Sequence, residues 1–168
     1  MSTADPVIRL ARAEDWPALW PLLRAVIRAG ETYAIAWRTS EAAARHLWLE
    51  GPRACYVATR DNALLGTYYI KTNHPGGGAH VCNCGYMVLE AARGQGIAAA
   101  MCRHSQHEAI RLGYKAMQFN LVLESNQGAI SLWERLGFET VGHLPRAFDH
   151  PRHGLVDARM MYKWLIEE

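Results

Sequence analysis

The chain has 168 residues, of which half are hydrophobic and 20% are charged, and its formal net charge is +2. This balance is typical of one globular domain, residues 1–168, and the scattered basic residues argue against a nucleic-acid or membrane partner. The start MSTADPVIRL has no apolar signal core and no stretch has membrane-spanning length, so the four cysteines indicate reduced thiols in a cytoplasmic protein.

The first half of the chain is predicted to form a strand, two helices and a hairpin. The strand is short and covers Val7–Leu10. Asp15 can cap a helix that ends at Gly30, and Ser40 can cap a second helix over EAAARHLWL. ACYVATR and LLGTYYIK flank Asp61–Asn62, which indicates an antiparallel hairpin.

The second half alternates strands with helices. After a flexible loop, TNHPGGGA, the segment HVCNCGYMVLE is a long strand, and a helix from Gly96 to Leu112 follows it. AMQFNLVL is the next strand, followed by a helix over Gln127–Leu136. FETVGHL and ARMMYKWL are predicted as two final strands, separated by a polar loop, PRAFDHPRHGLVD. This order predicts a mixed sheet with helices on both faces, an α+β or α/β fold.

The segment EAARGQGIAAAM places two glycines and an arginine between the long strand and its helix. Bare backbone N–H groups at a helix N-terminus bind anions, although glycines can also simply make a turn. From Gly94 the letters fit a dinucleotide fingerprint, and from Arg93 they fit a pyrophosphate loop of the coenzyme A type. A dinucleotide fold needs two βαβαβ halves, but only 44 residues follow Glu124, the one acid placed to meet a ribose. The coenzyme A type is therefore favoured.

Asn126 stands between a predicted strand and the last predicted helix. Its side chain can cap that helix. Because a right-handed crossover joins parallel strands, Asn126 is also expected at the carboxyl end of the sheet, on the same edge as the loop Arg93–Ala98.

R-G-Q-G-I-A at Arg93–Ala98 resembles the pyrophosphate loop of the GCN5-related N-acetyltransferases, and N-x-x-A-I-x-L-W-E-R-L-G-F at Asn126–Phe138 is similar to their next motif. The resemblance implies their fold over essentially the whole chain: a central, mostly antiparallel twisted sheet with a splayed parallel strand pair that binds acetyl-CoA. Backbone groups near Val88 would hold the pantetheine, and Asn126 would contact the pantetheine arm. The pyrophosphate would be held by the amides of Arg93, Gly94, Gln95, Gly96, Ile97 and Ala98.

A narrower resemblance concerns three asparagines. GETYA, HVCNCGYMV and QFNLVLESN look like the branch that contains the fungal L-azetidine-2-carboxylate acetyltransferases, which implies that Asn83, Asn120 and Asn126 handle substrate and cofactor. Asn83 and Asn120 lie in apolar strands, so we expect buried amides with partners, because an unpaired one costs roughly 1–3 kcal/mol. They form either a structural network or a catalytic pair that holds a neutral amine and its neighbouring carboxylate near the thioester.

The chain departs from the family at Trp133, where most members have a tyrosine that protonates the departing thiolate. An indole N–H is not a usable acid, so Trp133 is either a core aromatic or a wall of the cofactor pocket. An acid is not required, since a thiol of pKa about 8.5 leaves tolerably as the thiolate. Glu31 could act as a base through water, and we assign Glu31 and Tyr33 to substrate binding.

We therefore expect an acetyl-CoA-dependent N-acetyltransferase that acts on a small-molecule amine, an amino acid or an analogue, by direct attack. No metal is expected, because the CxC and H-x-x-H spacings lack further ligands. The sequence leaves open whether the protein forms a homodimer. The alternatives are a non-catalytic acetyl-CoA sensing domain and a dinucleotide-dependent oxidoreductase.

Overall fold

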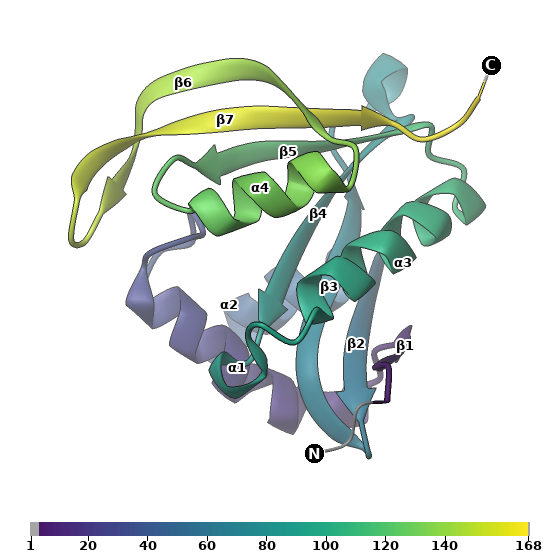
Figure 1. Ribbon diagram of the computed structural model, residues 1–168. Coiled ribbons are helices and arrows are strands. Elements are labelled where there is room, and N and C mark those ends of the chain that lie inside the picture. The colour runs from purple at the N-terminus through teal and green to yellow at the C-terminus, as the bar shows by residue number, and fades with distance from the viewer. Residues whose placement is uncertain (1–3, 168) are drawn as a thin grey trace.

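The structure is a computed structural model that describes residues 4–167. Its seven-stranded sheet has the order β1-β2-β3-β4-β5-β7-β6, shown in Figure 1. The pair β4 and β5 runs parallel, and the other five neighbouring pairs are antiparallel. The strands are β1 (Val7–Leu10), β2 (Ala54–Arg60), β3 (Ala63–Thr72), β4 (Val81–Val88), β5 (Ala116–Leu123), β6 (Glu139–His150) and β7 (Gly154–Trp164). The expected mixed α+β sheet is confirmed.

Helices cover both faces of the sheet (Figure 1). One face carries α1 (Trp16–Ala29) and α2 (Glu41–Arg45), and the other carries α3 (Ile97–Arg111) and α4 (Gln127–Arg135). Leu23 and Trp48 are buried on the first face, and Met101 and Phe119 on the second. Each such side chain contributes roughly 1.5–3 kcal/mol through burial. Within residues 4–167, no helix has the length and apolar character needed to span a membrane.

Local signals set most helix ends as expected. Gly30 follows α1 in a left-handed conformation, with φ of +64°, and the Ser40 hydroxyl accepts the third N–H of α2. The prediction that the Asp15 side chain caps α1 is wrong. Asp15 itself has helical dihedral angles at the end of a preceding 3₁₀ turn, so its carboxylate accepts the Arg12 N–H and pairs with Arg9 instead.

The polar segment PRAFDHPRHGLVD is not the loop that its composition predicted. β6 continues to His150 and β7 begins at Gly154, so a three-residue turn joins two long strands. Most of residues 145–157, the outer part of the β6–β7 ribbon, are exposed, which removes the apolar alternation that identifies a strand in a sequence. Arg152 in the turn pairs with Glu31 at 3.1 Å, so the ribbon tip lies against the loop that follows α1.

Candidate active site

The backbone of the loop between β4 and α3 is not covered by side chains at its two glycines. Gly94 and Gly96 have φ of +74° and +77°, and a Cβ on either would meet no atom within 4 Å. In the part of the chain that the structure describes, the N–H groups of residues 94–99 donate to no protein group. The Gln95 side chain is held by Arg60 at 2.8 Å and by the Ala91 carbonyl at 3.2 Å. These amides stand at the positive end of α3, so the loop can bind a pyrophosphate.

β4 and β5 separate soon after they begin. Their parallel pairing consists of Val81 with Ala116 and Cys82 with Met117, so the splayed pair expected from the sequence is present. Further along β4, the N–H of Leu89 points to β3, where it donates to a carbonyl. The N–H and C=O of one residue point to the same side of a strand, and this side alternates from residue to residue, so those of Tyr86 and Val88 face the gap between β4 and β5. We call this opening the β4–β5 gap.

Tyr33 reaches into the β4–β5 gap from the loop after α1. Its hydroxyl accepts the N–H of Tyr86 at 2.7 Å and donates to the carbonyl of the same residue. Burial of this hydroxyl raises the pKa of Tyr33, so the phenol stays protonated at neutral pH. The candidate substrate residue Tyr33 therefore occupies the free edge of β4.

A chain of side-chain amides follows the inner end of the gap. Asn83, only 7% exposed, donates to the Gln118 carbonyl at 2.9 Å and accepts from the Tyr69 hydroxyl at 3.2 Å. Asn120 accepts from the Gln118 side chain at 3.0 Å and donates to Asn73 at 2.8 Å. The expected partners are confirmed, but the expected burial of Asn120 is wrong. The helices on this face pack against β2, β3 and β4, which leaves the Asn120 side chain on β5 exposed.

Asn126 caps α4, and Trp133 lies within that helix. The Asn126 side chain accepts the Ala129 N–H at 3.3 Å, which confirms the cap. Trp133 is 9% exposed, and its ring centroid lies 5.1 Å from that of Tyr86 and 5.0 Å from that of Phe119. This packing supports the core alternative for Trp133.

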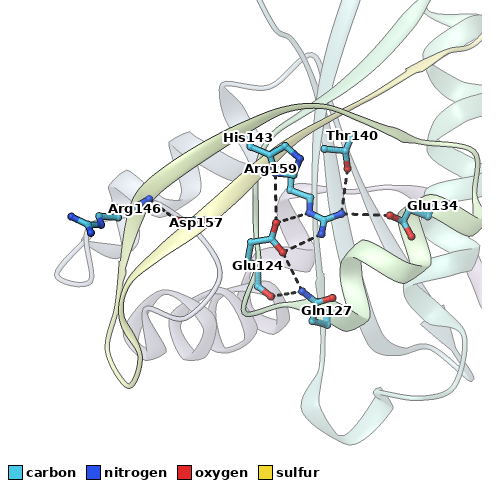
Figure 2. Close-up of polar contacts among 8 residues, drawn as sticks. All are labelled: Glu124, Gln127, Glu134, Thr140, His143, Arg146, Asp157 and Arg159. Atoms are coloured by element: carbon cyan, nitrogen blue, oxygen red, sulfur yellow. Dashed lines mark hydrogen bonds and ion pairs between the residues drawn. The ribbon is translucent and has the colours of Figure 1, made fainter.

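The two glutamates considered in the sequence analysis, Glu31 and Glu124, each form an ion pair with an arginine. Glu31 is paired with Arg152, as described for the ribbon tip. Figure 2 shows Arg159 between Glu124 at the end of β5 and Glu134 on α4. Its Nε lies 2.6 Å from Glu124 Oε1 and its Nη2 lies 3.2 Å from Oε2, and this bonding lowers the pKa of Glu124.

The dinucleotide alternative is contradicted by the same region. Glu124, the acid that it needs at a ribose, is engaged by Arg159. The sheet contains one parallel pair rather than two βαβαβ halves. Over residues 4–167, no group of three histidine, cysteine or acidic side chains is arranged to hold a metal ion, and the four cysteines are free and buried.

Four polar residues near the gap were not singled out from the sequence. Gln118 could have been found, because it alternates with Asn120 on one face of the predicted strand. The contacts of Tyr69, Asn73 and Arg152 each join segments that are distant in the chain, so no local pattern marks them.

Comparison with known proteins agrees with this geometry. The family described as "Acetyltransferase (GNAT) family" has a model that matches residues 16–138. A GCN5-related N-acetyltransferase from Kribbella flavida is 41% identical, with a TM-score of 0.92 over 98% of this chain and 100% of that one. The protein yncA from Salmonella typhimurium, described as a putative acetyltransferase with its cofactor acetyl-CoA, is 18% identical, with a TM-score of 0.81 over 98% of this chain and 96% of that one. At this identity, the likeness concerns the fold.

A similar protein is also known in fission yeast. The N-acetyltransferase aca1 of Schizosaccharomyces pombe is 41% identical over 97 residues, which are 57% of this chain and 46% of that protein. The match therefore spans just under half the length of the yeast protein.

Proposed function

The chain belongs to the GNAT family of acetyltransferases, and from this premise we propose that it transfers the acetyl group of acetyl-CoA to the amine of a small molecule. The proposed acceptor is an amino acid or an amino-acid analogue, and the proposed unit is one catalytic domain, residues 1–168. The observation that carries the proposal is the row of free amides at the start of α3, beside the open edge of β4.

The cofactor side of the site suits coenzyme A. The amides of Gly94 to Ala98 would bind the pyrophosphate, the peptide group of Val88 would bond the pantetheine, and Asn126 would contact the same arm. The Arg93 guanidinium adds a positive charge beside these amides. The Salmonella protein of the same fold has acetyl-CoA as its cofactor, which supports this choice.

The acceptor side suits an uncharged amine. Asn83 and Asn120 present amide groups, which can bond an amine and a carboxylate without stabilising an ammonium ion. Glu31 and Tyr33 come from the loop after α1, where Glu31 pairs with the ribbon tip and Tyr33 bonds the edge of β4. Glu31 is already bound to Arg152, so we assign it to shaping the pocket rather than to removing a proton.

The reaction would be direct attack. The amine lone pair forms a C–N bond to the thioester carbonyl, the C–S bond breaks, and the ammonium proton passes to water. The sulfur leaves as a thiolate, because a thiol of pKa about 8.5 needs no strong acid. Rate enhancement would come mainly from positioning the two reactants.

A free-thiol release assay with acetyl-CoA tests the proposal. The panel contains amino acids, proline analogues, polyamines and peptides, and the product is identified by mass spectrometry. We expect turnover with at least one amino acid or analogue. Tight acetyl-CoA binding without turnover of any amine would replace this proposal with the sensing domain. Turnover of polyamines or peptides alone would contradict the proposed acceptor class.

A further inference from the structure

The Tyr33 hydroxyl takes the hydrogen bonds that a neighbouring strand would otherwise make. It bonds both the N–H and the carbonyl of Tyr86, which face the β4–β5 gap. The peptide group of Val88, two residues further along β4, faces the same gap nearer the glycine loop. A ligand that extends along β4 from the loop therefore meets Val88 first and Tyr33 next.

Tyr33 is backed by buried aromatic rings. The Trp48 ring packs edge-on against it with centroids 5.8 Å apart, and Tyr69 packs edge-on against Trp48 at 4.7 Å. Trp48 is 2% exposed, and its Nε1 donates to Thr67 Oγ1 at 3.1 Å. Because interiors are close-packed, the Tyr33 ring cannot move toward Trp48 without disturbing these packed rings.

The gap is also closed beyond Tyr33. Asn83 bridges it with a bond to the Gln118 carbonyl, and the strands pair directly at Cys82 and Met117. The usable length of the gap thus ends at Tyr33, because Asn83 joins the two strands on its far side.

We propose that Tyr33 sets the length of the acyl group that the protein accepts. Its ring and hydroxyl end the β4–β5 gap at Tyr86, so the methyl group of an acetyl thioester fits short of Tyr33 and a longer acyl chain collides with it. Tyr33 is a specificity-determining residue for the acyl donor. This inference rests on the proposed use of an acyl-CoA substrate in the gap.

Equilibrium binding of acetyl-CoA and butyryl-CoA, measured by calorimetry without an acceptor amine, tests the inference. The wild-type chain should bind butyryl-CoA at least tenfold more weakly than acetyl-CoA. Tyr33→Ala should raise the relative affinity for butyryl-CoA at least tenfold, because it removes the ring. Tyr33→Phe keeps the ring and should change that ratio less than threefold. Trp37→Ala is the matched control, because Trp37 lies in the same loop and is 57% exposed.

The outcomes separate this inference from the proposed function. If the wild type binds acetyl-CoA but its preference is absent, or if Tyr33→Ala leaves the ratio unchanged, the role of Tyr33 is overturned and the acetyltransferase proposal stands. If the wild type binds neither thioester, the proposed function itself fails. Should Tyr33→Ala not fold, Tyr33→Leu provides the same comparison with a smaller loss of packing.

Discussion

Replacing Gly96 by alanine should weaken coenzyme A binding far more than it destabilises the fold. Gly96 has φ of +77°, and a Cβ there meets no protein atom within 4 Å, so the only intramolecular cost is backbone strain. That strain is about 1–2 kcal/mol for an L-residue in a left-handed conformation. In a chain of this size the melting temperature should fall by about 2–8 °C. The new methyl group instead occupies the space beside the free amides.

Gly113 provides a matched control. It follows α3 with φ of +96°, and a Cβ there also meets nothing within 4 Å, so Gly113→Ala carries the same strain far from the loop. Loss of one hydrogen bond to a charged phosphate costs about 1.5–3 kcal/mol, or about 10- to 150-fold in Kd. Calorimetry should therefore show weaker acetyl-CoA binding for Gly96→Ala and wild-type affinity for Gly113→Ala. Equal affinities in the two variants would refute the assignment of the loop.

Three further predictions concern other parts of the site. Asn83→Ala should lower the free energy of unfolding by about 1–3 kcal/mol, because it leaves two buried groups without their hydrogen-bond partner. The Asn120 side chain is exposed, so Asn120→Ala should lower the free energy of unfolding by at most about 0.5 kcal/mol. Both variants should lose kcat/KM, and equal melting temperatures would contradict the difference in burial. Trp133→Phe should lower kcat at most about tenfold, whereas loss of a true general acid would lower it about 10²- to 10⁴-fold. Arg159 lowers the pKa of Glu124 in the folded state. The Glu124 carboxylate therefore stabilises the fold at pH values above its ordinary pKa of about 4.3. This contribution is lost as the pH falls through the lower pKa that Glu124 has in the folded state. Glu124→Gln should therefore flatten the acid side of the melting-temperature profile.

The sequence predicted those parts of the fold that depend on local signals. The hairpin turn Asp61–Asn62 has positive φ at both residues, as the residue types suggest, and Gly30 and Ser40 end and begin helices as expected. The prediction that the Asp15 side chain caps α1 failed because a 3₁₀ turn, which has no periodic signature in the sequence, precedes this helix. The prediction of a loop over residues 145–157 failed for a related reason, since these parts of β6 and β7 pair with each other and have no apolar face.

In the candidate site too, the features that depend on neighbouring residues could be predicted from the sequence, and the contacts between distant segments could not. The glycine loop and the Asn126 cap are continuous in the chain, so their spacing indicates their geometry. The position of Tyr33 on Tyr86 joins residues 53 apart, and only the folded chain brings them together. Glu31 was a candidate base because it follows Gly30 at the exit of a helix, and its partner Arg152 comes from the ribbon tip, which is distant in the chain.

At the β4–β5 gap, the side chains that stabilise the fold are also those that we propose contact the substrates. Where two strands part, each loses the ladder bonds that would satisfy its peptide groups, and a buried unpaired peptide group is costly. In this protein Tyr33 satisfies the edge of β4, and the Asn83 amide satisfies the Gln118 carbonyl on β5. Both side chains have to be polar to do this, and both are uncharged, so neither adds the cost of a buried charge. The side chains that satisfy these two strand edges are therefore also the groups that we propose a thioester and an amine would contact. A variant of Asn83 or Tyr33 will change stability and specificity together, and the two effects can be separated only by comparing melting temperatures with ligand affinities in the same set of variants.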